Sequence, residues 1–281
     1  MSDLAVLVKA RLTMLVLLTT AVGFYLGADS PIDFVALFHA VFGTAMTAAG
    51  AAVLNQWWEH ALDALMHRTR ERPIPAGRIL PRHAFALGAA LAIAGVVYLA
   101  VTRNALSAFL AAATIAVYLL AYTPLKRIST VNTLVGAVPG ALPPVVGWAA
   151  ATGRLEGAAW SLFAILFCWQ IPHFFAIAWM YRDDYARGGF RMLSEDDETG
   201  VRSASQGVLF CMLLLIITGV PTYLGLTTQI YLPVALVLGC WFTYMAMQFH
   251  RKKTYQAARS LFLTSIIYLP LLLLTLVLTK S

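Results

Sequence analysis

Charged residues are scarce in this sequence. Asp, Glu, Lys and Arg together make up 12% of the 281 residues, whereas a soluble domain carries roughly 25%. Hydrophobic residues make up 60% of the chain. This balance excludes an ordinary soluble domain and indicates a polytopic membrane protein.

Several motifs of soluble enzymes are also missing. The chain contains neither a GxGxxG nor a Walker phosphate loop, and no Ser-His-Asp order can be read from it. Its three cysteines, Cys168, Cys211 and Cys240, all lie in apolar stretches and form no CxxC pair. We interpret them as small apolar residues that indicate nothing about the redox compartment.

Nine apolar stretches are long enough to cross a bilayer, for which about 20 residues suffice. We expect an all-α fold with nine transmembrane helices in a bundle around a central cavity open to the cytoplasmic side. Because the stretches use most of the chain, residues 1–281 are expected to form a single transmembrane domain. The stretches are 10–27, 34–57, 83–101, 105–122, 132–150, 159–180, 206–226, 230–248 and 260–278.

The basic residues fall almost entirely on one side of these nine spans. When the connections are assigned alternately, 17 of the 20 Lys and Arg residues lie on the side of the N-terminus, and Arg103, Arg154 and Lys280 lie on the other. The positive-inside rule then predicts a cytoplasmic N-terminus and a periplasmic C-terminus. The net charge of +7 is therefore attributed to contact with the lipid bilayer, and no nucleic acid partner is expected.

The N-terminus carries no recognisable targeting segment. Met-Ser-Asp precedes the first apolar stretch without the positive region of a cleaved signal, and no Arg- and Ser-rich transit peptide is visible. We therefore expect the first span to be retained, and we expect the bacterial inner membrane rather than the mitochondrial one.

Polar residues gather at the end of the second span. Asn55, Glu59 and Asp63 follow one another at intervals of four, which places all three on one helix face. Oxygen ligands of this kind suit Mg²⁺, which binds one or two carboxylates together with substrate phosphates. The alternative is a solvated helix end with i,i+4 pairs. Acids at a helix C-terminus oppose the macrodipole, which favours the metal site.

A second acidic pair, Asp183 and Asp184, begins the polar connection after the sixth span. We expect the two acidic segments to meet over one cavity, so that metal ions there could bridge a diphosphate and improve it as a leaving group. Arg68 and Arg72, four residues apart, could hold phosphate oxygens. Ordinary positive-inside anchoring is the alternative for both arginines. Lys126 would add another cation at the same mouth.

Two central spans carry prolines and polar groups. The fifth span contains Gly136, Pro139, Gly140, Pro143, Pro144 and Gly147. This pattern fits a helix that lines a cavity, and equally a kinked packing helix. The sixth span carries Gln170 and His173 beside Pro172. Metal ligation, proton transfer and a hydrogen-bonded interior histidine all stay open for His173.

The chain resembles the UbiA-type intramembrane prenyltransferases through the string Asn55-x3-Glu59-x3-Asp63-x2-Met66-x-Arg68-Thr69-x2-Arg72-Pro73. Its last part is similar to that of the haem-farnesylating branch, the haem O synthases. Glu59 stands where the superfamily usually has Asp, and Ala10 stands where Pro is usual. Further agreeing stretches are Lys9-x-Arg11, Tyr122-Thr-x-Leu-Lys126-Arg127, Asn132 with Gly136-x3-Gly140, Trp169-Gln170-x-Pro172-His173, and Tyr181-x2-Asp184-Tyr185-x2-Gly188.

The resemblance implies transfer of a farnesyl group from farnesyl diphosphate to a vinyl group of haem b, with Mg²⁺ as cofactor. It further implies a lipid-embedded enzyme that could meet haem A synthase or terminal oxidase assembly factors. The implied catalytic residues are Asn55, Asp63, Arg68, Arg72 and Lys126. The implied metal ligands are Asn55, Glu59, Asp63, Asp183 and Asp184. The implied substrate-binding residues are Lys9, Arg11, Tyr122, Arg127, Asn132, Gln170, His173, Tyr181 and Arg187.

Two alternative functions share part of this pattern. A UbiA-type prenyltransferase acting on an aromatic quinone precursor would share the first motif. A secondary transporter with broken helices would carry polar groups at mid-membrane on several spans. Because most acids here lie at one surface and the opposite connections are almost uncharged, the sequence favours the enzyme.

Overall fold

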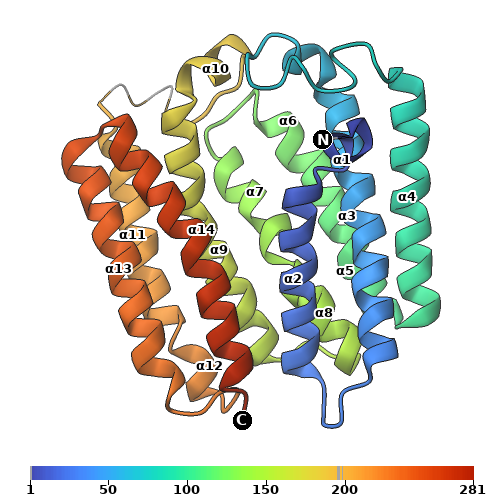
Figure 1. The fold of residues 1–281 in the computed structure, drawn as a ribbon, viewed down its shortest axis with the longest axis vertical. Coiled ribbons are helices and arrows are strands. Elements are labelled where there is room, and N and C mark those ends of the chain that lie inside the picture. Colours follow the sequence, from blue (N-terminus) through green and yellow to red (C-terminus); the bar gives the residue numbers. More distant parts are fainter. Residues whose placement is uncertain (1, 195–196, 198) are drawn as a thin grey trace.

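The structure is a computed structural model that describes residues 2–194, 197 and 199–281. In these residues the regular structure is helical (Figure 1). The elements are α1 (Asp3–Leu7), α2 (Ala10–Gly27), α3 (Phe34–Asp63), α4 (Pro81–Thr102), α5 (Ala105–Ala116), the π-helix η1 (Val117–Tyr122), α6 (Thr123–Leu125), α7 (Asn132–Ala141), α8 (Pro143–Thr152), α9 (Gly157–Met180), α10 (Arg182–Arg187), α11 (Val201–Ile217), α12 (Val220–Tyr223), α13 (Tyr231–Lys252) and α14 (Tyr255–Leu278).

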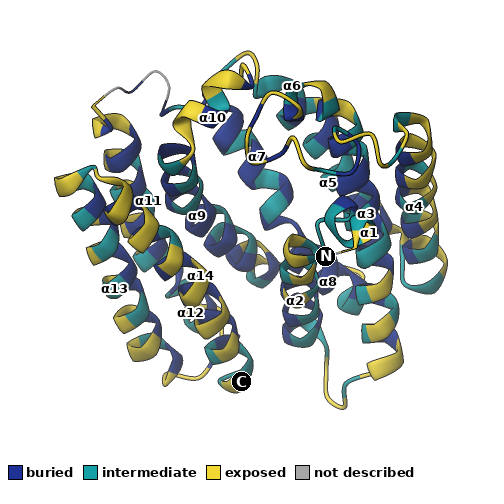
Figure 2. Cartoon of the chain, turned by 45° about the horizontal axis from the view of Figure 1, so that its top comes forward, coloured by how far each residue is buried: buried dark blue, intermediate teal, exposed yellow. Residues whose placement is uncertain are grey.

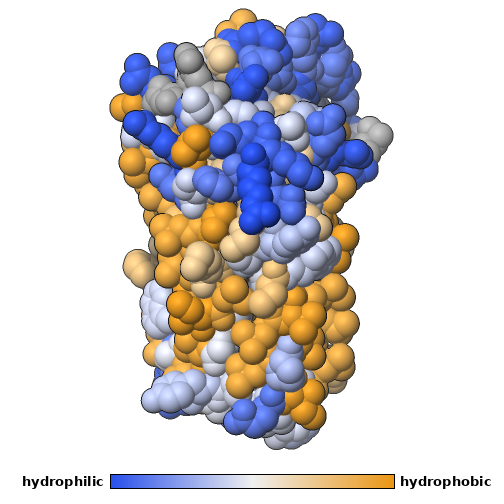
Figure 3. Space-filling view, turned by 90° about the vertical axis from the view of Figure 1, so that its left-hand side faces the viewer, coloured by the Kyte–Doolittle hydropathy of each residue, from blue (hydrophilic) through white to orange (hydrophobic). Residues whose placement is uncertain are grey.

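Within the described residues, nine helical segments are long and apolar enough to span a membrane. The all-α fold with nine transmembrane helices is thus confirmed, and all nine predicted spans are present. Figure 3 shows a hydrophobic belt beneath a hydrophilic cap. The cap lies at the end that carries α1, α6, α10 and the connection 64–80, called here the α10 end (Figure 1).

Several helices extend beyond the predicted spans at the α10 end. α3 has 30 residues and continues to Asp63, six residues past the predicted end, so the whole first acidic motif is helical. α11 begins at Val201 rather than at 206. Its first turn is stabilised by Asp197, whose carboxylate accepts a hydrogen bond from the Ser203 backbone N–H at 2.8 Å. Hydropathy misses such polar helix ends, although capping makes them stable.

The helices follow one another around the bundle. α2 packs on α3, α3 on α4, and α4 on α5, while α9, α11, α13 and α14 form the other side. α14 also contacts α2, which closes the ring between the two sides. Figure 2 shows exposed residues mainly on the outward faces and at the ends of the helices. The chain ends N and C lie toward opposite ends of the bundle (Figure 1).

The fifth and sixth spans form the centre. Buried residues make up 72% of an 18-residue apolar stretch in the fifth span (132–152) and 67% of such a stretch in the sixth (157–180). In the other spans of the described chain this share is 28–44%. The fifth span breaks at Leu142 into α7 and α8, because Pro143 begins the second helix. α8 approaches α2 closely through Gly23 and Gly147. A Cβ on either residue would lie 2.0 Å from a backbone oxygen of the other helix.

The fourth span contains one irregular turn. Residues Val117–Tyr122 form a π-helix between α5 and α6. Such single-turn insertions occur frequently at functional sites because they rotate the following side chains relative to a regular helix. Here the π-turn carries Tyr118 and Tyr122 toward the acidic end of α3, where Tyr118 contacts Asn55.

Candidate active site

The first acidic motif lies on a buried face at the end of α3. Asn55 is 1% exposed, Glu59 5% and Asp63 1%. The side-chain amide of Asn55 donates to Glu59 Oε2 at 3.0 Å and to the Thr123 hydroxyl at 3.2 Å. Buried carboxylates are costly unless they are paired. Their presence together on one helix therefore requires cations from elsewhere in the chain.

Three cations supply that pairing, one for each motif residue. Lys9 Nζ donates to Asn55 Oδ1 at 2.7 Å. Lys126 Nζ lies 2.7 and 2.9 Å from the two oxygens of Glu59. Arg72 Nη1 lies 2.6 Å from Asp63 Oδ2. We refer to these six residues as the buried charge network.

Local structure fixes the cations in place. Lys9 joins α1 to α2 and has a left-handed backbone with φ of 48°. Gln56, adjacent to Asn55, donates to the carbonyls of Val6 and Leu7 at 3.1 and 2.5 Å. The same helix that carries Asn55 therefore also holds the turn that carries Lys9.

Two tyrosines complete the inner side of the network. The Tyr118 hydroxyl donates to Asn55 Oδ1 at 3.1 Å and accepts from Lys9 at 3.1 Å. The Lys126 ammonium lies 4.6 Å from the centre of the Tyr122 ring, within the range of a cation–π contact. Tyr118 was not singled out from the sequence. The sequence feature that could have identified it is its position four residues before Tyr122, which places both tyrosines on the same side of a helix.

The network has more positive than negative groups, with three cations against the two carboxylates of Glu59 and Asp63. Burial lowers the pKa of Lys9 to about 7, and the positive charges of Arg72 and Lys126 act in the same direction. Burial alone would also lower the pKa of Lys126, but Tyr122 and Glu59 raise it overall. The site therefore favours a polyanion.

The second acidic segment, through Asp184, contacts the connection 64–80 that follows α3. Asp184, 7% exposed, accepts hydrogen bonds from the backbone N–H groups of His67 and Arg68, both at 3.1 Å, and forms an ion pair with Arg187. Burial alone would raise the pKa of Asp184, but these partners lower it overall. Asp183 instead is exposed and faces Arg182 at 3.7 Å.

A cavity of about 480 Å³ opens beside Asp184. The Arg68 guanidinium lies there between two rings, 5.2 Å from the centre of Tyr181 and 5.4 Å from that of Tyr185. With Arg187, this places two guanidinium groups at the α10 end of the bundle. The lining suits carboxylate or phosphate oxygens.

The segment that follows α10 also contacts Lys126. The backbone N–H of Arg191 donates to the Lys126 carbonyl at 2.7 Å, and the side chain of Asn132 donates to the Arg191 carbonyl at 2.7 Å. The ring of Phe190 lies 5.6 Å from the Lys126 ammonium. The two acidic segments thus lie at the same end of the bundle. Asp184 accepts a hydrogen bond from the connection 64–80, and the segment after α10 bonds to Lys126, which pairs with Glu59.

Other candidate residues lie apart from the network. Gln170 is buried in α9 and donates to the carbonyls of Ala137 and Leu166. His173 accepts or donates one hydrogen bond with Ser265 at 2.7 Å and stacks on Trp169 and Phe262, with ring centres 5.2 and 5.1 Å away. The side chains of Arg11 and Arg127 are exposed.

The donor set fits Mg²⁺ in a shared site. Among the described residues no group of three His, Cys, Asp or Glu side chains is arranged to hold a metal alone. Mg²⁺, however, commonly takes only one or two carboxylates and completes its shell with water and substrate phosphates. The hard oxygen donors of Asn55, Glu59 and Asp63 already face positive groups, so they can serve such a site once those groups have another partner.

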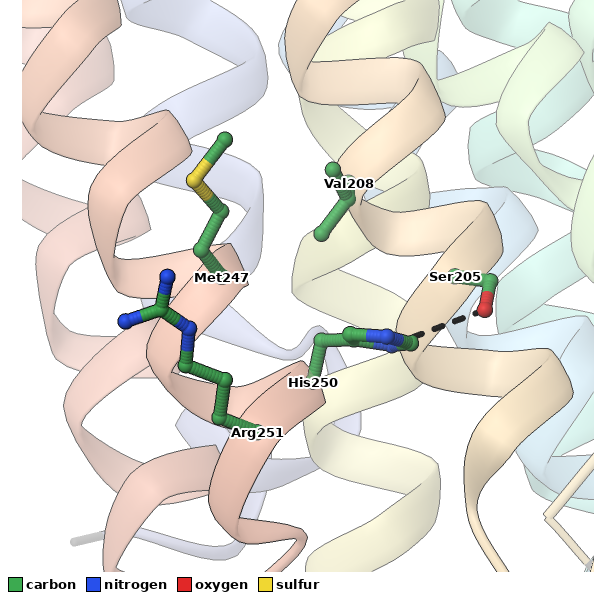
Figure 4. A pocket seen from close by; sticks show the side chains of 5 residues that line it. All are labelled: Ser205, Val208, Met247, His250 and Arg251. Carbon is green, nitrogen blue, oxygen red and sulfur yellow. Dashed lines mark hydrogen bonds between the residues drawn. The ribbon is translucent and has the colours of Figure 1, made fainter.

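A second recess, of about 390 Å³, lies between α11 and α13. Figure 4 shows His250 and Ser205 facing each other across it, with Met247, Arg251 and Val208 around them. The Ser205 hydroxyl and His250 Nδ1 are 3.5 Å apart. None of the described residues that line this recess is acidic, so we do not assign the candidate metal site to it.

Comparison with known proteins points to one family. Residues 16–272 match the UbiA prenyltransferase family. The chain is 45% identical over 281 residues to the protoheme IX farnesyltransferase of Solibacter usitatus (strain Ellin6076), a match that covers 97% of this chain and 96% of that protein. It is 39% identical over 277 residues to the mitochondrial protoheme IX farnesyltransferase of Homo sapiens, covering 99% of this chain and 62% of the human protein.

Solved structures show the same fold. A structure reported for digeranylgeranylglyceryl phosphate synthase superposes with a TM-score of 0.82 at 16% identity, covering 99% of this chain and 97% of that one. A UbiA homologue from Archaeoglobus fulgidus bound to GPP and Mg²⁺ superposes with a TM-score of 0.70 at 15% identity, covering 98% and 99%. At these identities the likeness concerns the arrangement of the helices alone.

Proposed function

Because this chain belongs to the UbiA prenyltransferase family, we propose that it transfers a farnesyl group from farnesyl diphosphate to a vinyl group of haem b, giving haem O and diphosphate. The relatives that match it over nearly its full length carry the name protoheme IX farnesyltransferase. This reading is favoured over a quinone-precursor prenyltransferase and over a secondary transporter.

One observation carries the proposal, namely the buried charge network. It combines hard oxygen donors with three cations at one end of an apolar bundle. A farnesyl diphosphate has the matching character, with a polyanionic head and a long apolar chain. The head would meet Lys9, Lys126 and Arg72, while the chain extends among apolar side chains. Bound Mg²⁺ would neutralise the diphosphate and make it a better leaving group.

The protein's own part is to bind the leaving group and to shield the allylic cation. In the reaction the bond between farnesyl C1 and the diphosphate oxygen breaks, and its electron pair leaves with the diphosphate. The haem vinyl group supplies the electrons for the new C–C bond, and water then adds to the resulting cation with loss of a proton. Lys126 and Arg72 would hold the leaving oxygens, and the rings of Tyr118 and Tyr122 would face the allylic cation.

Haem b would lie with its propionates at the α10 end. Arg68 and Arg187 line the 480 Å³ cavity there, and a guanidinium group holds a carboxylate in two parallel hydrogen bonds. His173, farther along α9, would contact the porphyrin, and its stacking between two aromatic rings would fix its orientation. These assignments distinguish haem from a small aromatic acceptor by size and by its two carboxylates.

The chain is a multi-pass membrane protein. We place it in the bacterial inner membrane with the α10 end in the cytoplasm, because 17 of 20 basic residues belong to that side. Haem A synthase or terminal oxidase assembly factors would be the partners that receive the product.

The direct test uses the purified protein in detergent with farnesyl diphosphate, Mg²⁺ and one of two acceptors, haem b or 4-hydroxybenzoate. We expect haem O, identified by mass spectrometry, and no prenylated benzoate. Prenylated benzoate without haem O would reject the haem assignment and leave the quinone-precursor alternative. Absence of both products, from a protein that is folded by circular dichroism, would reject prenyl transfer to either acceptor.

A further inference from the structure

We infer that Lys9, Lys126 and Arg72 compete with a divalent cation for the oxygens of the first motif, so that metal and diphosphate bind cooperatively. The cations would pass from the motif oxygens to the phosphate oxygens as the metal takes their place. This inference rests on the proposed diphosphate site. In addition to contacting the diphosphate, the three basic side chains would couple the binding of the two ligands.

The competition follows from the contacts. Lys126 bridges both oxygens of Glu59 at 2.7 and 2.9 Å, and Asn55 also donates to Glu59 Oε2, so a metal ion cannot bind both oxygens of this carboxylate unless Lys126 moves. Asn55 Oδ1 accepts from both Lys9 and Tyr118. One carbonyl oxygen cannot accept these two bonds and also ligate a metal along the same directions. Arg72 holds one oxygen of Asp63, Oδ2, at 2.6 Å.

A metal ion alone gains little from this arrangement. If it took Glu59, the Lys126 ammonium would lose its anionic partner, and its side chain is only 14% exposed. An unpaired buried charge is strongly unfavourable. The network already sets three basic side chains against two carboxylates, and a divalent ion would add two more positive charges. Free Mg²⁺ should therefore bind weakly.

A diphosphate removes both penalties. Its oxygens can accept hydrogen bonds from ammonium and guanidinium groups, so each displaced cation finds a new anion. Its negative charge also offsets the positive excess. Because such coupling is reciprocal, the metal must increase the affinity for diphosphate by the same factor as the diphosphate increases the affinity for the metal.

The geometry also specifies which cation matters most. Lys9 lies in a turn that is held by hydrogen bonds from Gln56. The Arg72 side chain is 22% exposed, so water can partly solvate its guanidinium group. The Lys126 side chain is less exposed, at 14%, and its ammonium contacts both oxygens of Glu59. Removing its charge should therefore release Glu59 for a metal and weaken the coupling.

The test measures Mn²⁺ binding by electron paramagnetic resonance on the purified full-length protein, with inorganic pyrophosphate as the second ligand. The signal of unbound Mn²⁺ is titrated with and without pyrophosphate, and the Mn²⁺–pyrophosphate complex in buffer is subtracted. For the wild-type protein we expect pyrophosphate to tighten Mn²⁺ binding on the order of 5- to 150-fold, the usual range of such coupling. Equal Mn²⁺ affinity with and without pyrophosphate would overturn the inference, and this result needs no variant.

The variant Lys126→Met tests the mechanism. We expect it to bind Mn²⁺ more tightly than wild type when pyrophosphate is absent, and to show a smaller coupling factor. Lys252→Met is the matched control, because Lys252 is an exposed lysine at the end of α13, and its Mn²⁺ affinity should equal that of wild type. Unchanged or weaker Mn²⁺ binding in Lys126→Met would refute the competition.

These readouts separate the inference from the proposed function. Strong coupling in a protein that produces no haem O would support the inference and reject the haem assignment. Haem O production without coupling between Mn²⁺ and pyrophosphate would support the proposed function and reject the inference.

Discussion

The contact between α2 and α8 gives the sharpest structural prediction. A Cβ added at Gly23 would lie 2.0 Å from the Pro144 backbone oxygen and 2.6 Å from its carbonyl carbon. A carbon and a carbonyl oxygen in contact are normally about 3.3 Å or more apart. Gly23→Ala therefore requires the two helices to separate by about 1.3 Å at this point, because a backbone oxygen cannot rotate away as a side chain can.

The cost follows from that displacement. Overpacking a well-filled core typically costs about 1 to 3 kcal/mol, and the upper end applies here because the obstacle is backbone on a central helix. Using the scale known for domains of this size, 3 kcal/mol corresponds to a fall in the melting temperature of roughly 5 to 10 °C. α2 also carries Lys9 at its start, so the variant should lower activity as well.

The assay is thermal unfolding of the purified protein in detergent, followed by fluorescence size-exclusion chromatography. Gly207→Ala is the matched control. Its added Cβ would meet Pro172 at 3.8 Å, an ordinary contact, so that variant should melt within about 2 °C of wild type or slightly higher. A Gly23→Ala protein that melts with wild type would refute the close-packing argument.

Four further outcomes are expected. Asp63→Ala should lower haem O formation about 100-fold or more while the chromatographic profile stays monodisperse; wild-type turnover would contradict the metal role. EDTA should stop the reaction and Mg²⁺ should restore it, whereas indifference to the chelator would count against a metal. Asp184→Asn should cost about 1.5 to 3 kcal/mol of stability at pH 7. Because the pKa of Asp184 is lowered in the fold, this difference should persist above about pH 4 and shrink below it. Lys280→Met should destabilise by about 1 kcal/mol, since its ammonium caps the end of α2 through the carbonyls of Tyr25 and Ala28; an unchanged melting curve would contradict this.

Local composition was sufficient to predict the membrane spans. Nine apolar stretches correspond to nine spanning helices in the described residues, because a bilayer needs a fixed length of apolar helix. The errors occur at polar ends. α3 continues to Asp63 and α14 begins at Tyr255, where the Thr254 side chain caps the first turn. Hydropathy averages do not register such caps.

The candidate site could be predicted only by residue type. The spacing of Asn55, Glu59 and Asp63 indicated a common helix face, and all three are buried in α3. The assignment of Asp183 and Asp184 as metal ligands stays a prediction, and the structure gives the two carboxylates different surroundings. The roles of Arg11 and Arg127 also stay predictions, because their exposed side chains do not join the buried charge network.

The sequence by itself determined the class of the molecule and the chemical groups at its polar end, because apolar length and residue spacing are local properties. Only the tertiary structure decided which cation meets which acid. Lys9 reaches Asn55 across 46 positions of sequence, and Lys126 reaches Glu59 across 67. Both pairings depend on contacts between separate elements, such as the hydrogen bonds of Gln56 to the turn that carries Lys9 and the π-turn that brings Tyr118 to Asn55.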